Sequence, residues 1–254
     1  MDESRYKREA QFHDEIFASR GRQATERYYS ITHSSSKAFY RNYLAATCKN
    51  KRVLEFGCGP DSHWERIAID GGHVTGIDLS PVAVALNSGK QAQTSSVAHF
   101  CVMNAELLAF ADGSFDLVCG NGILHHLDLH AAHKELARVL SPTGSAIFLE
   151  PLGHNPIINL YRTLTPQLRT PDEHPLIVAD FDLARKYFTK VEIHYFHLTS
   201  LAATAVAGMK GFRTTLQMLE ALDRWLFRHV KWLQKHAWAA AIILSNPRKS
   251  IDSV

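Results

Sequence analysis

Apolar and polar positions alternate along this chain in a way that predicts strands separated by helices. Short apolar runs bounded by charged residues or glycine are typical of buried strands. They cover residues 53–56, 74–77, 97–103, 114–119, 145–150, 191–198 and 238–244. The segments between them carry apolar residues three or four positions apart, which is the spacing of one helix face. This alternation predicts an α/β fold whose mostly parallel sheet carries helices on both faces.

Capping residues mark several helix boundaries. Residues 3–46 carry aromatic and aliphatic side chains at roughly helical spacing, which predicts helices before the first strand. Ser80, which is followed by proline, and Asp128 are suitable N-caps for helices that cross the sheet. An apolar helix is also expected over residues 200–209, where Gly211 would end it.

A second late helix is expected to begin at the capping box formed by Thr214 and Gln217. Its apolar stripe consists of Leu216, Leu219, Leu222, Leu226, Val230 and Leu233. We expect this stripe to pack the helix onto the domain as a substrate cap. The alternative, suggested by the neighbouring basic residues and by Trp225 and Trp232, is peripheral contact of residues 215–236 with a membrane surface.

The stretch 51–80 contains a recognisable nucleotide-binding pattern. An apolar strand ends at Gly57 and Gly59, which can bring the backbone close to a ligand because neither residue has a Cβ. A helix and a second strand follow, and that strand ends in Asp78, a residue type that accepts hydrogen bonds from ribose hydroxyls in such units. The dinucleotide motif is incomplete, because Ser62 occupies the position of its last glycine.

Three short runs resemble a known family. Glu55 completes the run E-F-G-C-G, I-D-L-S-P surrounds Asp78, and G-N-G-I-L-H-H-L follows the predicted fourth strand. These runs resemble the motifs of class I S-adenosylmethionine-dependent methyltransferases, most closely the ubiquinone/menaquinone-biosynthesis-like small-molecule branch. The resemblance covers residues 50–150 well and the rest of the chain in outline.

The resemblance implies a Rossmann-like seven-stranded sheet within a single domain that spans residues 1–254. The cofactor-binding core would be residues 50–150, preceded by an N-terminal helical lid at 1–48. Helical insertions after the fifth and sixth strands, at 151–180 and 199–236, would cap the active face.

The cofactor that the resemblance implies is S-adenosylmethionine. The glycine turn would hold its amino-acid end, Asp78 its ribose, and Asn104 with the backbone of Ala105 its adenine. The full set of cofactor contacts implied by the family is Glu55, Gly57, Cys58, Gly59, Asp78, Leu79, Asn104, Ala105, Glu106, Asn121 and Gly122.

Four histidines are candidate general bases on the expected active face: His125, His126, His154 and His174. Histidine suits this role because its pKa lies near the working pH. In the family, the two histidines after the fourth strand either stand near the transferred methyl group or support the cofactor pocket, and both interpretations stay open. Glu150 and Glu173 are alternative bases.

Aromatic and basic residues are candidates for the substrate pocket. They are Tyr28, Tyr29, Tyr40, Tyr161, Arg162 and Arg169. For any single tyrosine, packing in the protein interior is the commoner role.

A resident metal is not expected. His126, His130 and His133 recur at intervals of four and three, so a helix could bring them together. No cysteine or carboxylate obviously completes the set, and histidines on a helix surface are usually solvated.

Composition narrows the class of protein. The 254 residues suffice for one α/β domain, and a formal charge of +3 is too small to indicate nucleic-acid binding. Four cysteines without a C-x-x-C pattern, and a charged N-terminus without the apolar core of a secretion signal, lead us to expect a reduced, cytoplasmic protein. The oligomeric state is left open.

The expected activity is transfer of a methyl group from S-adenosylmethionine to an oxygen of a small, partly apolar molecule, with a histidine base. Methylation at carbon or nitrogen by the same fold is one alternative. A protein of this fold that binds a cofactor or a partner without catalysis is another. A nicotinamide-dependent oxidoreductase is disfavoured by Ser62 and Glu55.

Overall fold

A seven-stranded sheet forms the centre of the molecule. The computed structural model describes residues 3–19, 34–60, 62–166, 170 and 172–249. The strands are β1 (Arg52–Phe56), β2 (His73–Asp78), β3 (Ala98–Val102), β4 (Phe115–Asn121), β5 (Leu140–Pro151), β6 (Phe188–Phe196) and β7 (Ala239–Pro247). Each expected strand is present, although β5 begins five residues earlier than its apolar run, at Leu140 rather than Ser145.

The strand order is β3-β2-β1-β4-β5-β7-β6. Neighbouring strands from β3 to β5 pair in parallel, whereas β7 is antiparallel to both β5 and β6. The expected mostly parallel, Rossmann-like sheet is therefore confirmed. The order reverses between β1 and β4, and ligands of such open sheets bind beyond the carboxyl ends of the strands at that point.

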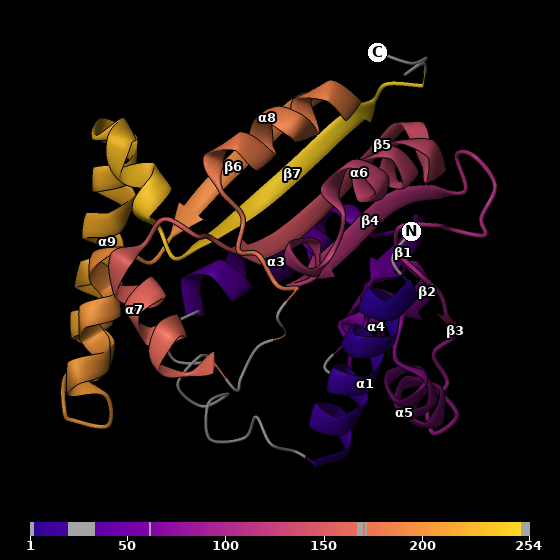
Figure 1. Ribbon diagram of the computed structural model, residues 1–254, viewed down its shortest axis with the longest axis horizontal. Helices are drawn as coiled ribbons and strands as arrows, with labels where there is room; N and C mark the ends of the chain where they lie inside the picture. Colours follow the sequence, from indigo (N-terminus) through magenta and orange to yellow (C-terminus); the bar gives the residue numbers. More distant parts are fainter. Residues whose placement is uncertain (1–2, 20–33, 61, 167–169, 171, 250–254) are drawn as a thin grey trace.

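Helices flank the sheet (Figure 1). The α-helices are α1 (Glu3–Ser19), α3 (Ser34–Thr47), α4 (Trp64–Ile69), α5 (Pro81–Gln91), α6 (Leu129–Val139), α7 (Pro156–Leu164), α8 (Val178–Tyr187) and α9 (Phe212–His229). Short 3₁₀ helices are η1 (Leu124–His126), η3 (Thr199–Val206) and η4 (Lys231–His236). The expected N-caps are confirmed: Ser80 accepts the N–H of Ala83 at 3.1 Å, and Asp128 accepts that of Ala131 at 3.0 Å.

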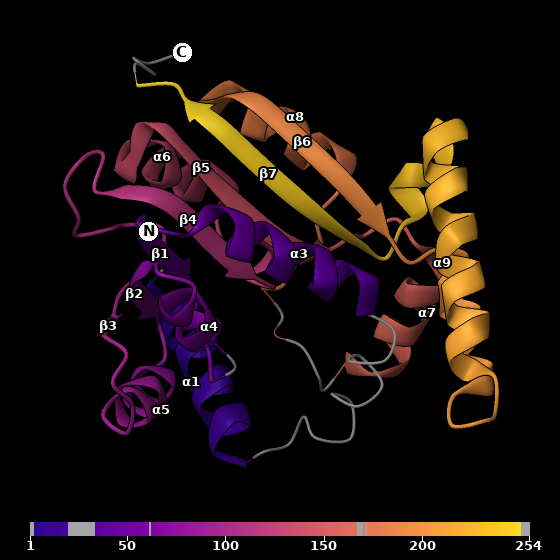
Figure 2. The same cartoon turned by 180° about the vertical axis from the view of Figure 1, so that it is seen from behind.

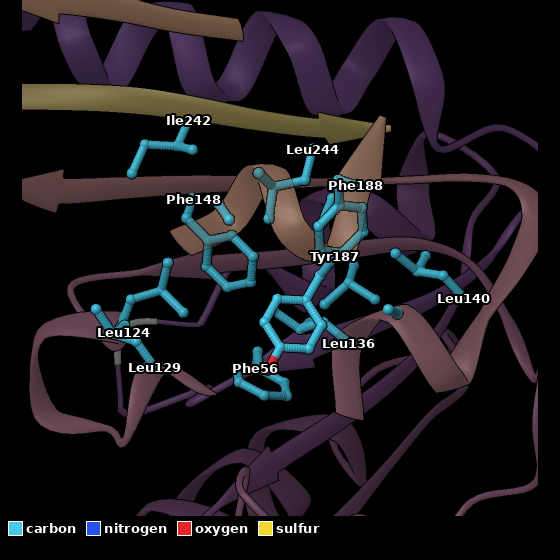
Figure 3. Close-up of a cluster of buried hydrophobic side chains, with 14 of the residues drawn as sticks. Phe56, Leu124, Leu129, Leu136, Leu140, Phe148, Tyr187, Phe188, Ile242 and Leu244 are labelled. Atoms are coloured by element: carbon cyan, nitrogen blue, oxygen red, sulfur yellow. The ribbon is translucent and has the colours of Figure 1, made fainter. Parts of the chain in front are cut away.

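Each face of the sheet has its own apolar core. On one face, the side chains of α6 and α8 pack with those of β1, β4, β5 and β7, including the buried Phe56 and Phe148, whose rings are 5.9 Å apart (Figure 3). On the other face, Tyr40 and Leu44 of α3 and Trp64 of α4 cover the same strands. Figure 2 shows α3 lying across that second face. Because residues that alternate along a strand point to opposite faces, burial on both sides explains the nearly continuous apolar runs in the sequence.

The C-terminal helices differ from expectation in two respects. The apolar segment expected as an α-helix over 200–209 forms the 3₁₀ helix η3 instead, and Asp223 of α9 accepts the N–H groups that begin it, those of Thr199 at 2.7 Å and Ser200 at 3.1 Å. The expected capping box at Thr214 is also wrong. Helix α9 begins at Phe212 after Gly211, whose φ of 90° ends the preceding turn.

The buried face of α9 is also rotated from the leucine stripe expected. Leu216 and Phe227 are buried on it, together with the 3% exposed Asp223, whereas Leu222 is 43% exposed. A buried carboxylate on the packed face could not be recognised from an apolar pattern. Among the described residues, the structure contains no helix both long and apolar enough to span a membrane.

Candidate functional site

The carboxyl ends of β1, β2, β3, β4 and β5 bring most of the expected site residues together. At the end of β1, Gly57 and Gly59 both have positive φ, at 69° and 50°. A Cβ on Gly57 would lie 2.8 Å from the side chain of Ile123, so this position requires glycine. A Cβ on Gly59 would meet nothing within 4 Å, which leaves open space where the backbone can face a ligand.

Two carboxylates hold this turn. Asp78, at the end of β2, accepts the N–H of Gly59 at 2.8 Å and that of Ser80 at 2.8 Å. Glu55 is 3% exposed and accepts the N–H of His63 at 2.7 Å and the hydroxyl of Ser62. Asp78 therefore ties the glycine turn to β2, and Glu55 fixes the loop that follows it. Through its bonds to Ser62 and His63, Glu55 has a positioning role in the loop.

Beyond β3, Asn104 and Glu106 form a polar corner. The Asn104 side-chain oxygen accepts the N–H of Glu106 at 2.9 Å, and Ala105 is buried between them. The Glu106 carboxylate accepts the hydroxyl of Tyr6 at 2.8 Å and the N–H of Asp128 at 2.9 Å, and it also pairs with Arg5. Glu106 therefore binds α1 to the segment that follows β4.

His125 is oriented by a buried acid. Glu150, 1% exposed at the end of β5, places Oε2 2.7 Å from His125 Nδ1. Its Oε1 accepts the backbone N–H groups of Ile123 and Leu124, both at 2.9 Å. Nδ1–H of His125 donates to this carboxylate, which leaves Nε2 on the other side of the ring, 4.0 Å from Glu173 Oε1. The result is a carboxylate–histidine pair of the kind that prepares an imidazole to take a proton.

His126 has a carboxylate of its own. Its Nδ1 lies 3.3 Å from Oε2 of Glu9, a residue of α1, and its ring centroid is 4.1 Å from that of His125. Ligand atoms of His125, His126 and Glu173 lie within 4.8 Å of one another, so these three residues could bind either a proton or a metal ion.

The histidine set considered for a metal from helical spacing is not assembled. His130 Nδ1 lies 3.0 Å from the Tyr187 hydroxyl, and His133 is buried with Nδ1–H donating to Leu129 O at 2.6 Å. Burial lowers the pKa of His133. His133 therefore packs in the core, whereas His130 is exposed and bonded to Tyr187 of α8.

Helix α1 crosses the carboxyl ends of the strands, and it supplies residues that the sequence analysis did not single out. Besides the contacts at Glu106 and His126, its Asp14 pairs with the hydroxyl of Ser80 after β2. Its Arg8 forms two hydrogen bonds of 3.0 Å with Asp172, in the segment after α7. A signal was present in the sequence, because Arg5, Arg8 and Glu9 recur three or four positions apart and share one side of a helix.

Four other expected cofactor residues lie near this site, and they contribute backbone or packing to it. Cys58 is buried, and burial raises the pKa of its thiol, so it serves as a small packing group. Gly122 has a φ of 68° and donates its N–H to Leu149 O at 2.9 Å. Asn121 is exposed at the end of β4, and Leu79 is half-buried after β2.

Three further expected catalytic and substrate residues differ in their surroundings. The side chain of His154 accepts the N–H of Val178 at 3.4 Å, and that of His174 is exposed, although its backbone N–H donates to His125 O at 2.9 Å. Tyr40 is 1% exposed in the core, where burial raises the pKa of its phenol. Tyr40 therefore packs in the core, whereas the catalytic roles of His154 and His174 stay predictions.

The remaining substrate candidates fall on α7 or outside the described residues. Tyr161 lines an apolar pocket with Leu164 and Trp238. Arg162 donates to Leu152 O at 3.0 Å and to Asn159 Oδ1 at 2.8 Å, which fixes α7 on the sheet. The other candidates, Tyr28, Tyr29 and Arg169, lie outside the described residues.

Comparison with known sequences gives a consistent assignment for the central part of the chain. Residues 54–148 match the family model described as a methyltransferase domain. The chain is 33% identical over 106 residues to the ubiquinone biosynthesis O-methyltransferase of Paraburkholderia xenovorans (strain LB400), a match that covers 41% of this chain and 46% of that protein. It is 39% identical over 113 residues to the demethylmenaquinone methyltransferase of Chlorobaculum parvum, covering 43% and 45%. The chain thus spans less than half the length of these curated relatives.

Solved structures share the fold over most of the chain. A phosphoethanolamine N-methyltransferase of Haemonchus contortus, in complex with S-adenosyl-L-methionine, superposes with a TM-score of 0.59 at 16% identity, covering 84% of this chain and 53% of that one. Geranyl diphosphate C-methyltransferase from Streptomyces coelicolor gives a TM-score of 0.60 at 13% identity, covering 84% and 77%. At these identities the superpositions establish the fold.

Proposed function

Because residues 54–148 match the model of a methyltransferase domain, we propose that this chain is a class I S-adenosylmethionine-dependent methyltransferase that transfers a methyl group to an oxygen of a small, partly apolar molecule. We further propose that His125 is the base. The observation that carries this assignment is the 2.7 Å contact between His125 Nδ1 and the buried Glu150, which leaves Nε2 on the side of the ring that faces Glu173.

The residues at the strand ends suit S-adenosylmethionine. The glycine turn offers backbone beside open space at Gly59, and the Asp78 carboxylate is held at its edge. Asn104 and Ala105, which follow β3, would meet the adenine. When bound there, S-adenosylmethionine supplies a methyl group already activated by its sulfonium. The protein then has to orient the acceptor, and orientation of this kind is worth about 7–11 kcal/mol of the barrier.

His125 is needed where the acceptor oxygen still carries its proton at neutral pH. An acceptor hydroxyl placed between His125 Nε2 and Glu173 Oε1, which are 4.0 Å apart, would be within hydrogen-bond reach of both. His125 would take the proton as the oxygen forms its bond to the methyl carbon. Glu150 would stabilise the imidazolium that results, because its carboxylate already accepts Nδ1–H.

The segments around this point form the proposed cap. Helix α1 corresponds to the expected lid in 1–48, and it contacts the ends of three strands through Asp14, Tyr6 and Glu9. The insertion 151–180 supplies Glu173 to the same place. With α1 closed, water is kept from the sulfonium and from the proton in transit.

The acceptor class rests on the relatives and on the apolar pocket of α7. The curated relatives are named for quinone biosynthesis, and the pocket on α7 is lined by Tyr161 and aliphatic side chains. These features favour a small molecule with an apolar part. Methylation at carbon or nitrogen is the second candidate, since a carbon acceptor would also use a base at His125, whereas an amine acceptor would not need one.

Incubation of the protein with labelled S-adenosylmethionine and a panel of phenols, quinols, enols and amines tests the proposal. We expect labelled methyl ethers from the hydroxyl acceptors. Product analysis separates oxygen from carbon and nitrogen methylation. If the cofactor binds and no acceptor turns over, and if His125→Ala changes nothing, the protein is a cofactor-binding relative without catalysis.

A metal-assisted reaction at the same residues is tested in that assay. The ligand atoms of His125, His126 and Glu173 are close enough for a cation, so a chelator is added to a matched sample. The proposed proton transfer predicts unchanged turnover with the chelator. Loss of turnover that is restored by a divalent cation would replace the base with a metal site.

A further inference from the structure

One side of α9 is apolar and faces solvent. Met218 is 68% exposed, Leu222 43% and Trp225 54%. At 100° per residue these three side chains lie within about 60° of one another around the helix axis. They lie opposite Leu216 and Phe227, which are buried against the domain. Helix α9 is therefore apolar on two opposite sides, and packing within the domain accounts for only one of them.

The exposed apolar surface continues beyond α9. Trp232 of η4 is 65% exposed, and on α7 Ile157, Leu160 and Leu164 are 67%, 62% and 71% exposed. Helices α7 and α9 both pack against η3. Ile158 of α7 contacts Leu201 of η3, and η3 packs along α9. Figures 1 and 2 place α7 and α9 at the same end of the molecule.

Positive charge borders this apolar surface. Residues 210–235 carry six exposed basic side chains: Lys210, Arg213, Arg224, Arg228, Lys231 and Lys235. The two acidic residues of the segment are Glu220 and Asp223, and the carboxylate of Asp223 is turned inward to Leu198, Thr199 and Ser200. On α9, Arg224 and Arg228 lie along one flank of the apolar side, about 60° or more from Trp225. Indole rings beside arginine and lysine are typical of helices that lie at a membrane interface.

We propose that the face formed by α7, α9 and η4 docks on the surface of an anionic lipid bilayer. Trp225, Trp232 and the aliphatic side chains of α7 enter the interfacial region, and the basic side chains pair with acidic headgroups. A surface that binds a protein of mixed charge would carry acidic residues among its basic ones. Apart from the inward-facing Asp223, the acidic residue of this segment is the half-buried Glu220, so a uniformly anionic partner fits better. This docking is independent of the proposed methyl transfer. It would bring the enzyme to acceptors that are dissolved in a membrane.

The four tryptophans make the contact measurable. Trp64 and Trp238 are 2% and 3% exposed, so a change of emission on adding vesicles reports on Trp225 and Trp232. The full chain is mixed with vesicles of phosphatidylcholine alone, and with vesicles that contain about 30% phosphatidylserine. Binding is measured by co-sedimentation and by the blue shift of the emission.

The result expected is binding to the anionic vesicles at least about tenfold tighter than to the neutral ones, weakened by added salt. The double variant Trp225→Ala/Trp232→Ala and the double variant Arg224→Glu/Arg228→Glu should each lose about tenfold or more. Ile69→Ala and Lys186→Glu, at exposed positions on other helices, are the matched controls and should bind as the unchanged protein does. Thermal unfolding confirms that each variant is folded.

Two outcomes would overturn the proposal. One is equal binding, or no binding, to the two kinds of vesicle by the unchanged protein. The other is a dimer in sedimentation velocity that Trp225→Ala dissociates, which would assign this face to a second copy of the chain.

Discussion

The carboxylate of Glu150 lies 2.7 Å from Nδ1 of His125 and is held there by two backbone N–H groups that its other oxygen accepts. The acid belongs to β5 and the histidine to the turn after β4, so pairing of two neighbouring parallel strands sets their separation. With 1% exposure, Glu150 is shielded from bulk solvent, and its bonds fix both the tautomer and the direction of the imidazole.

Replacement of Glu150 with glutamine tests this relationship. In Glu150→Gln the carbonyl oxygen can still accept the two backbone N–H groups, while the amide nitrogen would face His125 Nδ1 as a donor. His125 would then carry its proton on Nε2 and could not act as base. We expect kcat for a hydroxyl acceptor to fall about 10²–10⁴-fold, with unchanged affinity for S-adenosylhomocysteine by calorimetry. Unchanged kcat would remove His125 from the reaction.

Helix α1 is predicted to control retention of the cofactor. Tyr6→Phe removes the 2.8 Å hydrogen bond to Glu106, and a hydrogen bond to a charged group is worth about 1.5–3 kcal/mol. The variant should spend less time with α1 closed over the cofactor site. This should weaken the binding of S-adenosylhomocysteine about tenfold and speed its dissociation in stopped flow. Lys7→Ala, an exposed neighbour on α1, is the control and should change neither. Equal dissociation rates in Tyr6→Phe and Lys7→Ala would show that α1 is not a lid.

Stability should fall in mild acid because of His197. This residue is 1% exposed, and burial lowers its pKa from 6.5 to about 4 despite the nearby Asp223 carboxylate. Between these values the unfolded chain binds a proton that the folded chain does not, so the free energy of unfolding decreases as pH falls from about 6.5 to about 4, by about 3 kcal/mol in total. Denaturant titrations at several pH values measure this slope.

The matched variant is His197→Asn, since asparagine tolerates the positive φ of 63° at this position. It loses the bonds to the hydroxyls of Ser36 and Ser200, so it should be less stable at neutral pH. Its stability should nevertheless depend less on pH between about 4 and 6.5. An undiminished slope would assign the acid sensitivity to other groups, such as the buried His133.

The sequence was sufficient for the sheet, because its strands are buried on both faces and stand out as apolar runs. The sequence also predicted the glycine turn. The structure gives the reason that glycine stands there, because a side chain at Gly57 would collide with Ile123. The pairing of His125 with Glu150 could not be derived in this way. Both residues were candidates, but their relation depends on the register between β4 and β5.

The contacts of α1 and α9 were harder to foresee. The 3.3 Å contact between Glu9 and His126 joins residues 117 positions apart through packing that no local pattern encodes. On α9, a leucine stripe suggested which side of the helix is buried. The buried side instead includes Asp223, whose carboxylate accepts a backbone N–H of η3. Polar side chains that satisfy a neighbouring backbone inside a core are therefore what the apolar pattern missed.

The central claim is that the turn at Gly57 and Gly59, together with Asp78, seats an adenosyl donor, and titration calorimetry with S-adenosylhomocysteine tests it most directly. The unchanged protein should bind with one site per chain. Asp78→Asn, which keeps one acceptor oxygen for the turn but loses the charge that would hold the ribose hydroxyls, should bind at least about tenfold more weakly. Absence of binding by the folded protein, or equal affinity in Asp78→Asn, would contradict the assignment of this site.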